Sequence, residues 1–172
     1  MNHPGLWLER LEARDDVSGF ASGNNELDSW LHRHALAAQH MDSARTFLLV
    51  DGALGAASRI LGYFSLTMGS VLRAEAPAKL VRGLPAYPVG MVLLARLAVD
   101  RAEQGQGLGA LLLAEALRKA VAAGEAAAAR LVVADAIDDA AAKFYAHHGF
   151  MPAPSHPLRL YRRMKDIRAS LG

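Results

Sequence analysis

The most specific segment of the chain is Leu97–Ala110, which reads LAVDRAEQGQGLGA. It begins at the end of a mostly apolar run, passes through a short charged loop, and then carries glycine at three alternate positions before an amphipathic stretch. Glycine lets the main chain approach an anion closely and adopt conformations that a Cβ disfavours. The start of a helix adds unpaired N–H groups and a partial positive charge. The segment therefore predicts a phosphate or pyrophosphate site at residues 104–110.

Two other phosphate-binding motifs fit this segment less well. Gly105, Gly107 and Ala110 satisfy the dinucleotide pattern G-x-G-x-x-G/A, but charged residues separate them from the preceding strand. Only residues 136–172 remain for the further strand–helix units of a dinucleotide fold. A P-loop is excluded because no Gly-Lys-Ser/Thr follows. The alternative is that the glycines only permit a tight turn. That role would explain a single glycine better than three glycines at alternate positions.

The composition indicates one domain over residues 1–172 without cysteine chemistry. The chain has 172 residues, 52% hydrophobic and 21% charged, and no cysteine. These values exclude a disulfide scaffold, a thiolate zinc site and a cysteine nucleophile. No apolar run approaches the ~20 residues of a membrane span, and residues 1–10 show no signal peptide, so we expect a cytoplasmic protein without a membrane partner. The seven histidines show no ligand pattern with carboxylates, and no metal is expected.

Hydrophobic patterning predicts an α/β (α+β) fold with a mixed central sheet flanked by helices. The expected strands cover 6–11, 46–50, 60–71, 90–99, 130–135 and 158–163. The expected helices cover 25–40 and 107–123, followed by a short helix that Asp138 caps and Gly149 closes. Residues 74–89 contain three prolines, so we expect an irregular, functional loop there.

The glycine segment resembles the GNAT N-acetyltransferases. Residues 104–109, QGQGLG, match the motif Q/R-x-x-G-x-G/A, on which that family binds the pyrophosphate of acetyl-CoA. Further motifs between residues 18 and 150 are similar to the TacT/AtaT-like toxins of type II toxin–antitoxin modules: SGN (22–24), LDSWL (27–31), GYFSL (62–66), LARLAVD (94–100), DAI (135–137) and FYxxxGF (144–150). Two positions depart from the pattern. The family often has Cys where this chain has Ser22, and it often has Lys or Arg where this chain has Gln106.

The resemblance implies a GNAT fold and an enzyme that uses acetyl-CoA as its co-substrate to acetylate the α-amine of aminoacyl-tRNA, which blocks translation. It also implies a homodimer neutralised by a ribbon-helix-helix antitoxin, with DNA contacted only through that complex. The expected cofactor-binding residues are Leu97, Ala98, Val99, Gln104, Gly105, Gln106, Gly107, Leu108, Gly109 and Ala110.

Tyr145 is the expected general acid. A phenol with a pKa near ~10 can protonate a leaving thiolate of comparable basicity, and the resemblance places the family's acid at this position. A tyrosine that only packs before a glycine-terminated helix is the alternative. A main-chain N–H of Leu97, Ala98 or Val99 is expected to polarise the thioester carbonyl.

The strand over 91–99 contains no Glu, Asp or His. A lysine side chain, with a pKa near ~10.4, would need a positioned base, whereas an α-amine titrates near ~8. The absence of a base on this strand therefore favours an α-amine as the acceptor.

Four basic residues are candidates for contacts with tRNA. Arg96 is the charged residue inside an apolar strand, so it needs an ion-pair partner or an opening into a cleft, and we favour the cleft. Arg73, Lys79 and Arg82 flank or occupy the proline-bearing loop and could bind an RNA backbone. Solvated side chains without a partner are the alternative.

Two other functions stay open at this stage. One is a GNAT enzyme that acts on a small-molecule amine or a protein N-terminus. The other is a catalytically idle GNAT fold that serves as a binding or co-repressor module. The intact glycine motif together with Tyr145 argues against the idle module.

Overall fold

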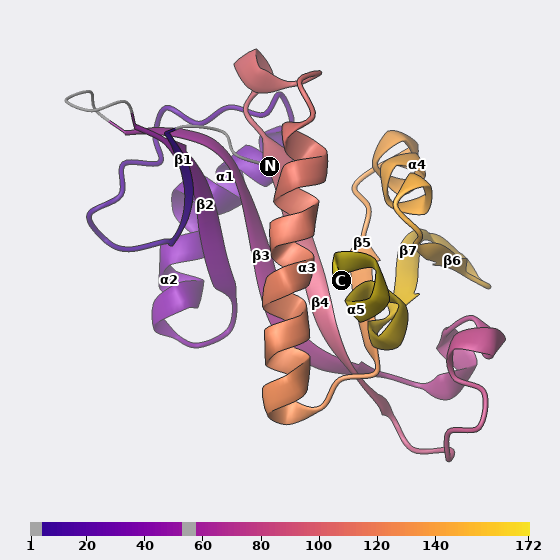
Figure 1. The fold of residues 1–172 in the computed structure, drawn as a ribbon. Coiled ribbons are helices and arrows are strands. Elements are labelled where there is room, and N and C mark those ends of the chain that lie inside the picture. Colours follow the sequence, from indigo (N-terminus) through magenta and orange to yellow (C-terminus); the bar gives the residue numbers. More distant parts are fainter. Residues whose placement is uncertain (1–4, 53–57) are drawn as a thin grey trace. The chain divides into compact units, whose positions relative to one another are not determined.

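The computed structural model describes residues 5–52 and 58–172, which contain a seven-stranded mixed sheet (Figure 1). The strand order is β1-β2-β3-β4-β5-β7-β6. The strands are β1 (Leu6–Arg10), β2 (Arg45–Asp51), β3 (Arg59–Val71), β4 (Val89–Val99), β5 (Leu131–Asp135), β6 (Met151–Ala153) and β7 (His156–Arg163). β4 and β5 are parallel, whereas β1–β2, β5–β7 and β6–β7 are antiparallel. The predicted fold class is confirmed.

Helices and short 3-10 turns connect the strands. The α-helices are α1 (Asn25–Arg33), α2 (Ala35–His40), α3 (Leu108–Ala127), α4 (Asp139–His147) and α5 (Met164–Leu171). The 3-10 turns are η1 (Arg73–Glu75), η2 (Ala78–Leu80) and η3 (Arg101–Glu103). Within the described residues, no helix combines the length and apolar character that crossing a membrane requires.

The described chain divides into two compact units, and β3, β4 and α3 each run from one into the other. The first unit comprises residues 1–65 and 96–113, and the second comprises 66–95 and 114–172. That residues 1–172 form a single functional domain stays a prediction.

The first unit packs α1 and α2 against β2 and β3. Its core contains Leu11, Phe20, Leu31, Ala35, Leu48, Val50, Tyr63 and Ala98. The single helix predicted over 25–40 is wrong, because His34 has a non-helical conformation (φ −122°) that separates α1 from α2. α2 carries Gln39, whose buried side chain donates to Leu11 O and accepts from Thr46 N–H. The break thus lets α2 supply partners for one main-chain group just after β1 and one within β2.

The second unit is built around β5, where residues 131–134 are fully buried. Residues from the proline-bearing loop join its core, which contains Val71, Ala76, Leu80, Val81, Val89, Met91, Leu131, Val133, Ala153 and Tyr161. The apolar side chains of the loop are therefore buried in this core, and the loop forms η1 and η2. The sequence patterns missed β6, which has three residues and includes Pro152, and α5, which follows β7 without a breaking residue.

Candidate active site

The glycine turn leads directly into α3. Gly105 and Gly107 have φ angles of +81° and +83°, in the left-handed region that glycine adopts without strain. A Cβ at either position would meet nothing within 4 Å, so the backbone conformation and not crowding requires glycine. Helical hydrogen bonding begins where Leu111 N–H donates to Gly107 O at 3.2 Å. The N–H groups of residues 108–110 lie in the first turn and have no acceptor within the helix.

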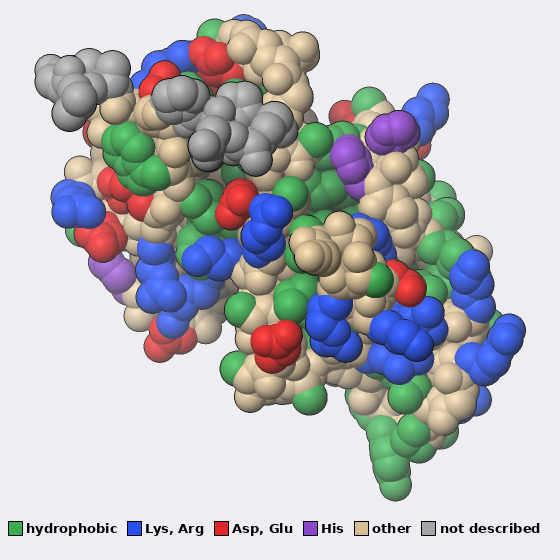
Figure 2. All heavy atoms as spheres, in the orientation of Figure 1, with side chains coloured by type: hydrophobic (Ala, Val, Ile, Leu, Met, Phe, Trp, Pro, Cys, Tyr) green, Lys and Arg blue, Asp and Glu red, His purple; other side chains and the backbone are tan. Residues whose placement is uncertain are grey.

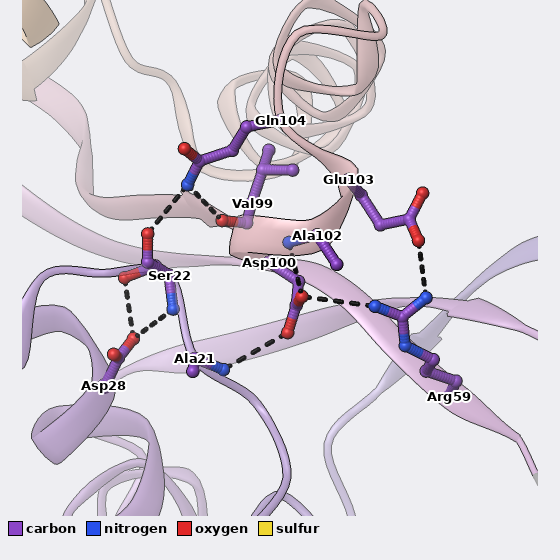
Figure 3. A network of polar contacts seen from close by, with 9 residues as sticks. All are labelled: Ala21, Ser22, Asp28, Arg59, Val99, Asp100, Ala102, Glu103 and Gln104. Atoms are coloured by element: carbon purple, nitrogen blue, oxygen red, sulfur yellow. Dashed lines mark hydrogen bonds and ion pairs between the residues drawn. The ribbon is translucent and has the colours of Figure 1, made fainter.

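The side chain of Gln104 fixes the start of this turn (Figure 3). Its Nε2 donates to Ser22 O at 2.7 Å and to Val99 O at 2.9 Å. Ser22 is held in turn by Asp28, which accepts from its N–H at 2.9 Å and from its hydroxyl at 2.7 Å. The Gln104 side chain thus connects the turn to β4 and to the segment before α1. Its observed role is to shape the turn, and its N–H donors are already used within the protein.

Asp100 is a second fixed point that the sequence analysis did not identify. This buried carboxylate accepts from Ala21 N–H at 3.2 Å and from Ala102 N–H at 3.0 Å, and it pairs with Arg59 at 3.2 Å (Figure 3). Arg59 also pairs with Glu103. A lone acidic residue directly after an apolar strand, capping a short 3-10 turn, was the signal that could have revealed it.

The end of β4 directs alternate main-chain groups to opposite edges of the strand. Asp100 N–H donates to Leu61 O of β3 at 2.7 Å. Because consecutive residues of a strand point their N–H groups to opposite edges, the N–H groups of Leu97 and Val99 point away from β3. Val99 O agrees, since it accepts from the Gln104 side chain on that side. The N–H of Ala98 faces β3, which leaves Leu97 and Val99 as the candidate donors to a thioester oxygen.

Tyr145 lies on α4 in the second unit, and both ends of this helix are fixed. Asp138 accepts from Ala141 N–H at 2.8 Å, as the sequence predicted. At the other end, Gly149 N–H donates to Ala146 O and Phe150 N–H donates to Tyr145 O, each at 3.1 Å, with Gly149 at φ +89°. This is a Schellman motif, in which an apolar contact accompanies the hydrogen bonds.

The Schellman motif places Phe150 against Tyr145, with ring centroids 5.6 Å apart. Tyr145 is 3% exposed. Burial raises the pKa of its phenol, and the charge of Asp135 raises it further. The phenol is protonated at neutral pH, as an unperturbed tyrosine also would be, and this is the form a general acid needs.

Arg96 has an aromatic partner that neither prediction for this residue included. Its guanidinium carbon lies 4.2 Å from the centroid of the Trp30 ring, and Trp30 stacks on Tyr63 at 6.2 Å. Tyr63 itself is fully buried and donates its hydroxyl to Leu27 O at 2.7 Å. A cation–π contact holds a charge over an apolar surface, so Arg96 is positioned by α1 and β3 of its own unit.

The basic residues of the proline-bearing loop are partly brought together. Arg73 and Arg82 line one groove of about 520 Å³, whereas Lys79 is exposed on η2 and is not among the lining residues. Arg73 also donates to Leu84 O. Figure 2 shows Lys and Arg side chains gathered on the face of the second unit that carries β7, α5 and the loop, with few acidic side chains among them. Such a face suits a polyanion.

Across residues 5–52 and 58–172, no group of three or more His, Asp or Glu side chains is arranged to hold a metal ion.

Residues 54–152 match the family model described as an acetyltransferase (GNAT) domain. The chain is 41% identical, over 95% of its own length and 95% of the other chain, to a protein of Mycobacterium tuberculosis named tRNA-acetylating toxin. Its fold matches the solved structure of AtaT complexed with acetyl-methionyl-tRNA, with a TM-score of 0.87 and 27% identity over 97% of this chain and 99% of that one.

The fold also matches a tyrosine-to-phenylalanine mutant of the AtaT toxin, bound to the C-terminus of the antitoxin AtaR and acetyl-CoA. The TM-score is 0.82 and the identity 26%, over 97% of this chain and 98% of that one. By the domain match and by its similarity to the M. tuberculosis protein along nearly the whole chain, the protein belongs to the GNAT acetyltransferases, in the same family as the tRNA-acetylating toxin.

Proposed function

We propose that this acetyltransferase is a toxin that transfers the acetyl group of acetyl-CoA to the α-amine of aminoacyl-tRNA and so blocks translation. The observation that carries the proposal is the similarity to the tRNA-acetylating toxin, which extends over almost the full length of both chains. The glycine turn and the buried, fixed Tyr145 supply the two parts that such a reaction needs.

The residues of the glycine turn fit a pyrophosphate. Anions are bound by main-chain N–H groups at a helix start, and Leu108, Gly109 and Ala110 offer such groups at the start of α3. Gly105 and Gly107 have open space where a Cβ would stand, so a phosphate oxygen could approach their main chain. Gln104 holds this shape through its hydrogen bonds to Ser22 and Val99.

Acetyl-CoA would supply the acetyl group as a thioester, whose carbonyl carbon the amine attacks as the C–S bond breaks. The N–H of Leu97 or Val99 would donate to the carbonyl oxygen, which gains negative charge in the transition state. Tyr145 would give its phenolic proton to the leaving thiolate, and the proton that the amine loses would pass to solvent.

Basic residues would hold the tRNA. Arg73 and Arg82 line one groove that could take backbone phosphates, and Lys79 is exposed close by in the sequence. Arg96, fixed over Trp30, would contact the acceptor end. Each phosphate contact of this kind contributes to affinity and weakens as salt rises.

The same family relationship supports further partners. An AtaT toxin has been solved with its antitoxin, and the AtaT–AtaR complex has been solved bound to DNA. We therefore propose an antitoxin of the ribbon-helix-helix type, a homodimeric toxin, and DNA contacts made only through the antitoxin. A cytoplasmic location and a reaction without a metal are part of the proposal.

The test is to incubate the purified protein with radiolabelled acetyl-CoA and charged tRNA, uncharged tRNA, free amino acids or a peptide. We expect label on the charged tRNA only, recovered after nuclease digestion as an N-acetyl-aminoacyl adenosine. Label on free amino acids or on the peptide would instead establish the small-amine or protein N-terminus activity. Binding of acetyl-CoA without any transfer would identify an idle module.

A further inference from the structure

The second unit contains a cleft beside β5 and β7 that the sequence analysis did not identify. It has a volume of about 430 Å³, and its polar lining residues are Glu75, Asp135, Ser155, His156, Arg159 and Tyr161. Asp135 and Arg159 form a two-pronged ion pair, with Nε to Oδ1 at 2.8 Å and Nη2 to Oδ2 at 3.2 Å. The pair joins the end of β5 to β7, in the register Asp135↔Arg159.

Tyr161 is the unusual member of this lining. Its side chain is 1% exposed, and its hydroxyl is a buried polar atom that makes no hydrogen bond of ordinary geometry. The Arg159 guanidinium lies close enough to oppose the rise that burial causes in its pKa. A buried hydroxyl that is left unpaired costs about 1–3 kcal/mol, so an unpaired one that lines a cleft calls for a ligand. By contrast, the hydroxyl of the buried Tyr63 donates to a main-chain carbonyl, that of Leu27.

The charge of the cleft favours an amine over a phosphate. The cleft is lined by two carboxylates, those of Asp135 and Glu75, by the imidazole of His156 and by one guanidinium, that of Arg159, which is already paired with Asp135. A neighbouring groove has the opposite character, since Arg73 and Arg82 line it. The turn η1 contributes Glu75 to the cleft and Arg73 to the groove. One short segment therefore separates a site for a cation from a site for anions.

The cleft is also connected electrostatically with Tyr145. Burial is the main cause of the raised pKa of the Tyr145 and Tyr161 phenols, and the charge of Asp135 adds to the rise in each.

We propose that this cleft binds the aminoacyl end of the acceptor. The α-amine would be held as an ammonium ion against the carboxylates of Asp135 and Glu75 and would lose a proton to solvent before it attacks, and the Tyr161 hydroxyl would donate to the ester carbonyl. The adjoining groove then takes phosphates of the same tRNA end. This inference rests on the proposed function, because it assumes an acceptor that carries an amine, an ester and phosphates together.

The test is steady-state acetylation of charged tRNA by the full-length Tyr161→Phe variant. We expect the KM for charged tRNA to rise about five-fold, the loss of one hydrogen bond, with kcat and the acetyl-CoA affinity unchanged. Thermal stability should stay the same or increase, because the variant removes an unpaired buried hydroxyl. A residue that only packs would change stability and leave the KM as it was.

Two further variants complete the experiment. Glu75→Gln keeps the acceptor for Leu72 N–H but removes a charge, and we expect it also to raise the KM for charged tRNA. Tyr87→Phe is the matched control, because Tyr87 is 74% exposed and does not line this cleft, and we expect wild-type values. Transfer to charged tRNA with an unchanged KM in both Tyr161→Phe and Glu75→Gln overturns the assignment of the cleft. No transfer to charged tRNA by the wild-type protein overturns the proposed function and this assignment together.

Discussion

The glycine turn and the Asp135–Tyr161 cleft offer a ligand different kinds of polar groups. In the turn, the groups available to a ligand belong to the main chain, and the side chains of Gln104 and Asp100 are used to hold its shape. In the cleft, the available groups are side chains, and one of them, the hydroxyl of Tyr161, has no partner. The side chains of Gln104 and Asp100 find their hydrogen-bond partners within the protein, whereas the Tyr161 hydroxyl of the polar cleft does not.

The difference indicates which region tolerates change. A main-chain site binds any ligand with the same phosphates, and it depends on backbone angles more than on side-chain identity. A side-chain site discriminates between ligands, because a polar group that loses its partner costs free energy. We therefore expect substitutions in the turn to alter affinity for acetyl-CoA and substitutions in the cleft to alter the choice of acceptor.

The largest effect should come from Tyr145→Phe. Loss of a general acid lowers the rate by about 10²–10⁴-fold, so we expect kcat to fall by that factor. The Phe150 contact and the hydrogen bonds of the Schellman motif do not need the hydroxyl, so folding and acetyl-CoA binding should persist. Single-turnover kinetics and calorimetry measure the two quantities. Wild-type turnover in this variant would remove Tyr145 from the mechanism.

Gly107→Ala tests the turn, and the chain offers a matched control in Gly83→Ala. Both glycines have a positive φ, +83° and +82°, and a Cβ at either would meet nothing within 4 Å. Both variants should lose about 1–2 kcal/mol of stability in chemical denaturation, because a left-handed conformation is strained with a Cβ.

Only Gly107→Ala should also weaken acetyl-CoA binding, by about ten-fold if the strain is relieved by moving the N–H groups. Calorimetric titration of both variants with acetyl-CoA measures this difference. Equal affinity in the two variants would argue that the turn does not hold the pyrophosphate.

Arg96→Ala should have a smaller and more selective effect. The cation–π contact with Trp30 contributes about 1 kcal/mol, so we expect a modest loss of stability. Acetylation of charged tRNA should fall several-fold more than hydrolysis of acetyl-CoA, and Arg96→Lys should restore part of it by keeping the charge. If both activities fall equally in Arg96→Ala, the residue has a structural role only.

The smallest effect concerns alkaline pH. Burial raises the pKa of Tyr63, Tyr145 and Tyr161, so these phenols hold their protons in the folded state above the pH of about 10 at which unfolded tyrosines ionise. The folded state then binds more protons than the unfolded state, and stability must fall as pH rises past that value. Denaturant titrations between pH 8 and about pH 11 measure the slope, which should be shallower in Tyr161→Phe. If the slope of stability against pH is the same in Tyr161→Phe as in the wild-type protein, Tyr161 ionises equally in the folded and unfolded states.

Several local features of the fold were predictable from neighbouring residues. Asp138 caps α4 and Gly149 ends it, because both act on main-chain groups within a few residues. The break at His34 was not predictable in this way, since the helix is interrupted where Gln39 reaches Leu11 and Thr46 from distant parts of the chain.

The sequence by itself determined the parts whose physics is local: the glycine turn before α3, the caps of α4, the apolar strands and the family resemblance. Only the tertiary structure decided how side chains are shared between segments. It turned Gln104 inward to Ser22 and Val99, placed Arg96 over Trp30, and left the hydroxyl of Tyr161 unpaired in a cleft with Asp135 and Arg159. The physical reason is that a local pattern specifies backbone angles and burial, whereas the partner of a polar side chain depends on which distant residues the packed core brings within about 3 Å.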